Sequence, residues 1–310
     1  MSGQAAQSVT VVLCTFNGEA HLAEQLNSVL AQQACDVKVV VSDDGSQDAT
    51  RAILARFAAK HPGLHWRPGP ARGFVRNFFS LIGDAAIDNE YFALADQDDL
   101  WLPEHLSRAL QWLATVPESV PALFASRTCL VNDEGHEIGL SPQHVRQPAF
   151  RNALIQNIAS GNTMVFNRAA RDLLAKLGSY NMPDWHDWAL YQVVTACGGR
   201  VFYDQQPSVL YRQHARNAIG AQWTWRSRWQ RVRLLAQGRF QAWNAQNLKA
   251  LAGIEAHMTP ENRALLHGFA ALRAMRSPWA RVHALHKLGL YRQTRLGQLG
   301  LYLAALTGLI

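Results

Sequence analysis

Residues 92–103 read FALADQDDLWLP and place three carboxylates, those of Asp96, Asp98 and Asp99, between two apolar runs. The first run is typical of a buried strand, and Pro103 suits the first turn of a helix. Carboxylates this close repel one another by several kcal/mol at an effective dielectric constant of about 20. Either one of them is protonated or a cation neutralises them, and oxygen ligands favour Mg²⁺ or Mn²⁺. The alternative is a solvated turn in which Asp99 caps the helix.

Strands and helices alternate around this stretch. Apolar, β-branched runs predict strands over residues 9–13, 37–41, 91–95 and 122–131, and apolar residues at helical spacing predict helices over 20–33, 48–60, 75–82 and from 103 onward. The alternation indicates an α/β fold with a mainly parallel sheet, in which ligands bind at the carboxyl ends of the strands. If the strand at 91–95 continues to residue 98, Asp96 and Asp98 point to the same side.

Three expected strand ends carry polar sequences, CTFNG (14–18), SDDGS (42–46) and DQDD (96–99). In the second, Gly45 predicts a tight turn, where a carboxylate can accept from a ribose hydroxyl or a base N–H. Helix capping by Ser46 or Asp48 is the alternative there. No G-x-G-x-x-G follows the first strand, which disfavours a dinucleotide-binding fold, and no P-loop motif occurs. The aspartate pair comes too late in the chain for a haloacid-dehalogenase-type phosphatase.

Net charge differs between the first 220 residues and the rest of the chain. Residues 221–310 hold 13 Lys and Arg against 2 Asp and Glu, whereas the whole chain is at +7, so the first 220 residues carry about −4. This basic region includes an aromatic and cationic stretch that suits an anionic membrane surface: Trp223, Trp225, Arg226, Arg228, Trp229, Arg231 and Arg233. No recognised nucleic-acid module accompanies it, so nucleic acid is not expected as a partner. Packing on the preceding domain is the alternative.

Other features limit the class of protein. The four cysteines lie far apart and lack the spacing of a zinc site or a disulfide framework, which favours reduced, cytosolic thiols. The N-terminus has no signal-peptide pattern, and no apolar run reaches the roughly 18–20 residues of a spanning helix. The apolar segment 297–310 is too short to span and is expected to lie on a bilayer or to pack on a partner.

The motifs taken together resemble the inverting glycosyltransferases of family 2, which have a GT-A fold. The matching pieces run in order from about residue 9 to 220: VVLCTFNGEAHLAEQLNSVLAQ, VVVSDDGSQDAT, GFVRNFFSLI, YFALADQDDLWLPEHL, SGNTMVFNR, HDWAL and YRQHARNAIG. The DQDDLW form, with GFVRNF before it and YRQH-x-x-N after it, looks most like bacterial rhamnosyltransferases that build surface polysaccharide, lipopolysaccharide or O-antigen.

The resemblance implies a role for each matching position at the strand ends. Thr15 and Asp43 match positions that hold the uracil or thymine nucleoside of the donor. Asp96 matches the first aspartate of the D-x-D motif, near the ribose. Asp98 matches its last aspartate, the ligand of a metal that bridges the donor diphosphate. Asp99 is expected to take acceptor hydroxyls or to support the residues that do.

The resemblance also implies a catalytic base. Asp187 in WHDWAL matches the general base that accepts the proton of the acceptor hydroxyl. His186 stands where the family commonly has Glu, and the flanking Trp185 is expected beside the acceptor sugar. The alternative is a surface aspartate between Trp185 and Trp188.

Further positions are candidates for donor contacts. His214 in YRQHARN matches a position that contacts the diphosphate or the metal, and Arg76 and Arg72 are candidates for phosphate contacts. Gly161 in SGNTM predicts a turn where the backbone approaches the ligand.

These inferences predict a GT-A domain over residues 1–220 and a basic, membrane-associating helical region over residues 221–310. The expected enzyme uses Mg²⁺ or Mn²⁺ to move a sugar, L-rhamnose from dTDP-L-rhamnose, onto a glycan or lipid-linked glycan acceptor. Its expected location is the cytoplasm, peripheral to the inner face of the cytoplasmic membrane. Two alternatives stay open, a non-catalytic nucleotide-sugar binding protein and a metal-dependent phosphohydrolase.

Overall fold

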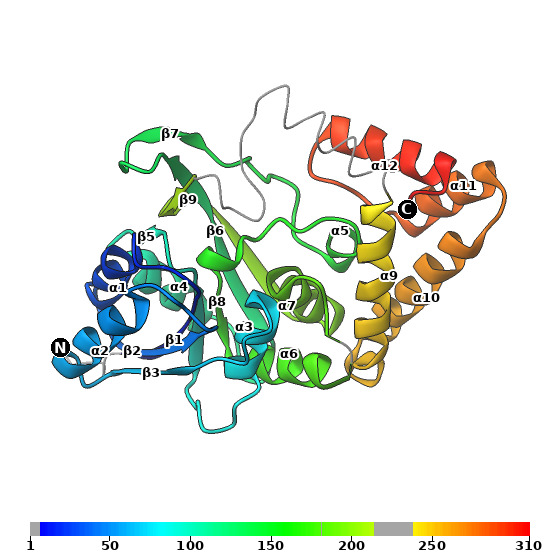
Figure 1. Cartoon of the computed structure of the whole chain (residues 1–310). Helices are drawn as coiled ribbons and strands as arrows, with labels where there is room; N and C mark the ends of the chain where they lie inside the picture. The colour runs from blue at the N-terminus through cyan, green and yellow to red at the C-terminus, as the bar shows by residue number, and fades with distance from the viewer. Residues whose placement is uncertain (1–6, 181, 214–237) are drawn as a thin grey trace.

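A computed structural model describes residues 7–180, 182–213 and 238–310, and its centre is a nine-stranded sheet with strand order β3-β2-β1-β4-β8-β6-β9-β5, in which β7 pairs with β6 (Figure 1). The strands are β1 (Gln7–Thr15), β2 (Cys35–Asp43), β3 (Leu64–Pro68), β4 (Tyr91–Ala95), β5 (Leu100–Trp101), β6 (Ala122–Val131), β7 (Glu137–Leu140), β8 (Val165–Asn167) and β9 (Arg200–Arg212). The pairs β1–β2, β1–β4, β2–β3 and β6–β9 are parallel, and β8 runs antiparallel to both β4 and β6.

Helices cover both faces of the sheet. The face with Val9, Val11 and Leu13 packs on α1 (Leu22–Leu30), α2 (Thr50–Lys60) and α4 (His105–Leu113). The face with Val12 and Cys14 packs on α3 (Phe74–Ile82), α6 (Arg168–Tyr180) and α7 (His186–Ala196). Successive β1 residues face opposite cores because side chains alternate along a strand. The short α5 (Phe150–Ala153) and the 3₁₀ turn η1 (Gly161–Thr163) complete this part.

The strand before the acidic cluster does not continue to residue 98. β4 ends at Ala95, so strand alternation does not place Asp96 and Asp98 on one side. Four residues, 96–99, connect β4 to β5, whose residues Leu100 and Trp101 pair with Leu210 and Val209 of β9. In β6, the register with β9 shifts between Ser126 and Thr128, an irregularity that bends a strand and increases its twist.

The basic C-terminal region is helical where the structure describes it. It contains α9 (Arg239–Ala252), the 3₁₀ turn η2 (Glu255–His257), α10 (Pro260–Ala274), α11 (Pro278–Leu288) and α12 (Arg295–Thr307). Thr259, Ser277 and Thr294 cap α10, α11 and α12 by accepting a backbone N–H, as helix N-caps do. In the described part of the chain, no helix combines the length and the apolarity needed to cross a membrane.

These helices share a core with the sheet. Leu251, Phe269, Leu285 and Leu301, one from each helix, belong to the same buried cluster as Trp188 of α7. Figure 1 shows α9 and α10 beside α6 and α7, with α11 and α12 beyond them. Packing on the preceding domain therefore holds for the residues from 238 onward, while Trp223 and its neighbours lie outside the described residues.

Truncating Leu272 of α10, whose side chain is fully buried, is expected to lower the free energy of unfolding. Leu272→Ala should cost about 2–5 kcal/mol, because it removes buried methyl groups and leaves a cavity. Denaturant titration measures the loss. Leu303→Ala on α12 is the matched control, since that side chain is 60% exposed. Equal stability of the two variants would contradict a shared core.

Candidate active site

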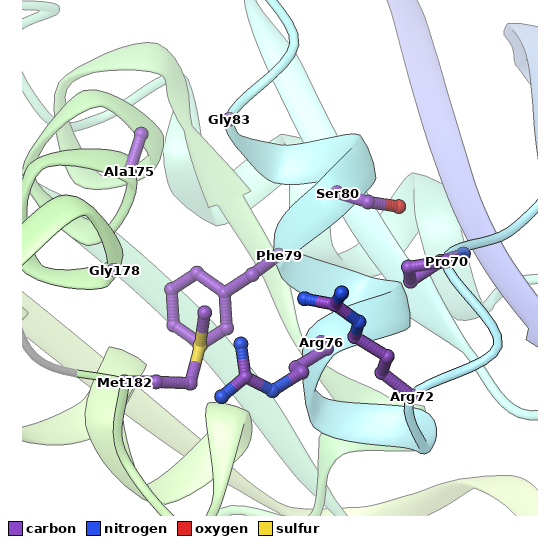
Figure 2. A pocket seen from close by; sticks show the side chains of 9 residues that line it. All are labelled: Pro70, Arg72, Arg76, Phe79, Ser80, Gly83, Ala175, Gly178 and Met182. Atoms are coloured by element: carbon purple, nitrogen blue, oxygen red, sulfur yellow. The ribbon is translucent and has the colours of Figure 1, made fainter.

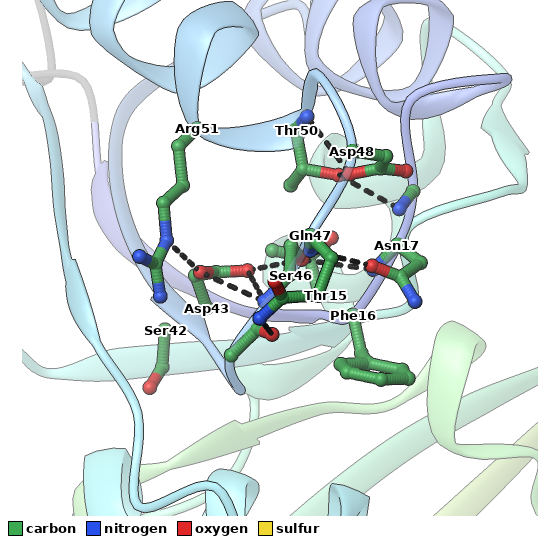
Figure 3. Close-up of polar contacts among 12 residues, drawn as sticks. Thr15, Phe16, Asn17, Ser42, Asp43, Ser46, Gln47, Asp48, Thr50 and Arg51 are labelled. Atoms are coloured by element: carbon green, nitrogen blue, oxygen red, sulfur yellow. Dashed lines mark hydrogen bonds and ion pairs between the residues drawn. The ribbon is translucent and has the colours of Figure 1, made fainter.

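The carboxyl ends of β1 and β2 form a dense polar network (Figure 3). The fully buried Asp43 accepts from Arg51 Nε at 2.6 Å and from the hydroxyl of Ser46. The hydroxyl of Thr15 donates to Gln97 Oε1 at 2.7 Å, which ties β1 to the loop after β4. Two residues predicted to hold the nucleoside therefore lie at neighbouring strand ends, paired at the last step of the β1–β2 register. Of the capping alternatives, Asp48 accepts from Thr50 N at the start of α2, whereas Ser46 bonds Asp43.

The start of α3 is tied to the same network. The carboxylate of Asp44 accepts from Gly73 N at 2.7 Å and from Arg72 N at 3.3 Å. Gly73 has φ +88°, a left-handed conformation that glycine adopts without strain. Phe74 follows directly and is 43% exposed, so an aromatic ring stands next to the expected nucleotide end of the site.

The acidic cluster is not a solvated turn. Asp99 is 1% exposed, and its carboxylate accepts from Asn162 Nδ2 at 2.5 Å and from Arg212 N at 3.1 Å. Burial, followed by the charges of Asp98 and Asp96, raises the pKa of Asp99 well above its usual range. Desolvation, followed by the charges of Asp98 and Asp187, raises the pKa of Asp96 to about 7. The mutual repulsion inferred from the sequence is thus present in the fold.

One guanidinium holds the acidic loop. Arg212, the last residue of β9, is 3% exposed. Its Nε donates to the carbonyl of Asp98 at 3.1 Å, its Nη1 to the carbonyl of Asp133, and its Nη2 to Glu24 of α1 at 2.8 Å. A planar fork with five donors suits this task, because it reaches several acceptors at fixed angles. Arg212 therefore positions the acidic loop.

Asp187 lies in the first turn of α7. Its carboxylate accepts from Asn157 Nδ2 at 2.9 Å and from Trp188 N at 2.7 Å. Desolvation raises the pKa of Asp187 to about 6, although these hydrogen bonds oppose the rise. A Cβ added at Gly161 would come within 3.3 Å of the Asp187 Cβ, so the glycine lets the backbone approach the aspartate.

His186 lies in a buried, aromatic environment, unlike the neighbouring Asp187. Its ring stacks on Phe78 with centroids 4.0 Å apart, and burial lowers the pKa of His186 to about 3. Among the described residues, neither ring nitrogen has a hydrogen-bond partner, so the imidazole packs here as a neutral ring. The aromatic contacts continue outward, from Phe74 to Trp185 at 5.5 Å and from Trp185 to Trp243 of α9 at 6.0 Å.

The strand ends bring the predicted carboxylates together. The charges of Asp96, Asp98, Asp99 and Asp187 all contribute to raising the pKa of Tyr211, after burial. Asp187 also acts on Asp96, although 91 positions separate them in the chain. Among the described residues, no group of three or more His, Cys, Asp or Glu is arranged to hold a metal ion. Mg²⁺ commonly takes one or two carboxylates and completes its shell with water and phosphate oxygens, so this oxygen-rich cluster fits a hard divalent cation.

Arg76 and His214 are the two remaining candidates for phosphate contacts. Arg76 lines a hollow of about 270 Å³ between α3 and α6, shared with Arg72, Phe79 and Met182 (Figure 2). None of the four carboxylates lines this hollow. A contact of Arg76 with the donor phosphates therefore stays a prediction. His214 lies outside the described residues.

Sequence reasoning missed the residues that orient the carboxylates. Asn157, Asn162, Tyr211 and Arg212 contact or face them from β9, η1 and the connecting loops. Gln97 instead ties the acidic loop to Thr15. Two signals were available, because Gln97 sits inside DQDD and the pair Tyr211–Arg212 opens YRQH. Neither signal states which carboxylate each residue contacts.

Comparisons with known proteins point in one direction. The family model described as Glycosyl transferase family 2 matches residues 10–174. The dTDP-rhamnosyl transferase RfbG of Shigella flexneri is 27% identical over 232 residues, which cover 72% of this chain and 78% of that protein. An uncharacterised protein of Mycobacterium tuberculosis is 30% identical over 215 residues, which cover 67% of this chain and 59% of that protein.

Solved structures agree in fold. The mannosyltransferase PcManGT from Pyrobaculum calidifontis, in complex with GDP-Man and Mn²⁺, superposes with a TM-score of 0.52 at 22% identity, over 96% of this chain and 80% of that one. An S. aureus TarS fragment in complex with UDP-GlcNAc superposes with a TM-score of 0.53 at 17% identity, over 97% and 91%.

Proposed function

Since the chain belongs to glycosyl transferase family 2 and is a glycosyltransferase with the GT-A fold, we propose that it transfers L-rhamnose from dTDP-L-rhamnose to a lipopolysaccharide or other surface-glycan acceptor. The observation that carries the proposal is the meeting of Asp187 with the acidic loop. A carboxylate from α7 faces a loop that already holds three others. A donor site and a proton acceptor are what an inverting transfer requires.

On the donor side, Thr15 and Asp43 take the nucleoside and Asp96 takes the ribose. Asp98 would hold Mg²⁺ or Mn²⁺, which when bound neutralises charge that develops on the diphosphate. The repulsion between Asp96 and Asp98 supports this assignment, because a cation relieves it. Arg212 keeps the loop in place through the carbonyl of Asp98.

On the acceptor side, Asp187 accepts the proton of the attacking hydroxyl. One carboxylate base suffices for inversion, since no covalent glycosyl-enzyme forms. Asn157 holds the Asp187 carboxylate through a hydrogen bond, and Gly161 leaves room beside it. Trp185 lies two residues before Asp187 and its ring contacts Phe74 at 5.5 Å, and we assign Trp185 to the apolar face of the acceptor sugar. Asp99 accepts a hydrogen bond from Asn162 and so anchors the acidic loop of residues 96–99.

The proposed acceptor also bears on location. A lipid-linked glycan is reached at the inner face of the cytoplasmic membrane, and the basic C-terminal region supports a peripheral association there.

A panel of nucleotide-sugars tests the proposal. Thermal shift with dTDP-L-rhamnose, UDP-glucose and GDP-mannose, each with and without Mg²⁺ or Mn²⁺, measures donor binding, because a ligand of the folded state raises the melting temperature. We expect the largest metal-dependent shift with dTDP-L-rhamnose. Release of dTDP in the presence of a glycan acceptor then measures transfer. Binding of no nucleotide-sugar would overturn the proposal, and release of inorganic phosphate without an acceptor would indicate a phosphohydrolase.

The pKa of the base predicts a pH profile. Because desolvation raises the pKa of Asp187 to about 6, and a base must be ionised to accept a proton, kcat/KM should fall as the pH is lowered through about 6. The loss should approach tenfold per pH unit below that value, since one proton inactivates the base. Circular dichroism at each pH checks that the protein stays folded. A flat profile down to about pH 5 would contradict the assignment.

A further inference from the structure

Helix α12 has two different faces. Leu301, Ala304 and Ala305 are buried against the core at 1%, 7% and 0% exposure. On another side, Leu296, Leu299 and Leu303 are 73%, 60% and 60% exposed. Their spacing of three and four residues places them on one stripe of the helix. This set of three leucines, the α12 stripe, is an apolar surface that no described residue covers.

The C-terminal region that carries the stripe has an excess of positive charge. Residues 238–310 contain nine Lys and Arg against two Asp and Glu. The two acidic side chains are engaged elsewhere, Glu255 with His267 and Glu261 with Arg151. The exposed side chains of Arg276, Lys287 and Arg295 form no ion pair with described residues, and Arg295 directly precedes the stripe.

We propose that the α12 stripe docks on the surface of a lipid bilayer that contains anionic headgroups. Exposed leucines on one helix face, directly preceded by Arg295 in a positively charged region, match the two interactions that hold an interfacial helix, apolar insertion and attraction to anionic lipid. Trp279 of the neighbouring α11 is 76% exposed, and tryptophan favours the headgroup level. Figure 1 shows α12 at an edge of the fold, beside α11.

A second copy of the chain fits this surface less well. It would bring the same excess of positive charge to the contact, and like charges repel. Three leucine side chains are also few for a stable protein interface, which buries roughly 800 Å² and about 20–30 residues per partner. The inference deepens the peripheral association proposed above by naming the surface that makes it. It does not depend on the transfer reaction, because docking requires neither donor nor acceptor.

Co-sedimentation of the full chain with vesicles tests the docking. Phosphatidylcholine vesicles with and without phosphatidylglycerol are compared, at low and high salt. We expect binding to the anionic vesicles that weakens as salt increases, since salt screens the attraction. The triple variant Leu296→Gln, Leu299→Gln, Leu303→Gln should lose at least about tenfold in binding. Glutamine and methionine have helix propensities close to that of leucine, so neither change should unfold α12.

The matched control replaces the same three leucines by methionine. That variant should bind as the wild type does, because the face remains apolar. Wild-type binding by the glutamine variant would overturn the proposal and place any membrane contact elsewhere. A dimer in light scattering that the glutamine variant dissolves would also overturn it. Both results leave the transfer reaction unaffected, so failure here is distinguishable from failure of the proposed function.

Discussion

Asp187→Asn is expected to slow sugar transfer by roughly 10²–10⁴-fold while donor binding stays unchanged. The amide keeps the shape of the carboxylate and still accepts the hydrogen bond that Asn157 Nδ2 donates at 2.9 Å. It cannot accept a proton from the acceptor hydroxyl. The initial rate of dTDP release with acceptor measures the first effect, and calorimetric titration with the donor measures the second.

A neighbouring aspartate supplies the control. Asp184 is exposed and lies three residues before Asp187, so Asp184→Asn removes the same charge without touching the site. It should transfer sugar at the wild-type rate. Wild-type transfer by Asp187→Asn would show that Asp187 is not the base. Loss of donor binding would show that Asp187 contacts the donor.

Asp98→Asn should abolish the metal dependence of donor binding, the second large effect. In the wild type, a donor and metal at about 100 times their dissociation constant stabilise the fold by about 2.7 kcal/mol, and the variant should lose this gain. Without metal, the same substitution should raise the free energy of unfolding. The charge of Asp98 helps to raise the pKa of Asp96 to about 7, so removing it lowers that pKa. The metal-free variant is then more stable than the wild type at about pH 8, where Asp96 is ionised in the folded state.

The change in stability of Asp98→Asn has opposite signs with and without metal and donor, which makes the test specific. Differential scanning fluorimetry with and without Mg²⁺ or Mn²⁺ and dTDP-L-rhamnose gives both values. Asp172→Asn, on the exposed surface of α6, removes one charge away from the site and should change neither. An unaltered response of Asp98→Asn to metal would show that Asp98 is not the ligand.

Local sequence predicts the first half of the fold well. β1, β2, β4 and β6 were expected because each is a continuous apolar run, as strands buried on both faces are. The convergence of CTFNG, SDDGS and DQDD also follows from sequence, since neighbouring parallel strands end at one edge. The family and the fold class are confirmed by the family match and by the solved structures.

The rest depends on contacts that local sequence does not encode. β9 was not predicted because its middle is polar and contains Pro207, and its pairing with β6 overrides that preference. Asn162 reaches Asp99 across 63 positions, and Arg212 reaches Glu24 across 188. His186 stacks on the Phe78 ring, and nothing in the sequence HDWAL indicates this contact.

The curvature of the sheet determines how much chain the acidic loop needs. β4 and β5 are four strand spacings apart in the sheet, about 19 Å if the sheet were flat. The five residue steps from Ala95 to Leu100 reach only about 17–18 Å when fully extended. A flat sheet would thus leave no slack for the carboxylates to face a ligand. The sheet must therefore curve between β4 and β5, and the register shift at Ser126 and Thr128 is an irregularity of the kind that bends strands. Loop length therefore constrains the site as much as residue identity does, and an insertion there should be tolerated less well than a substitution.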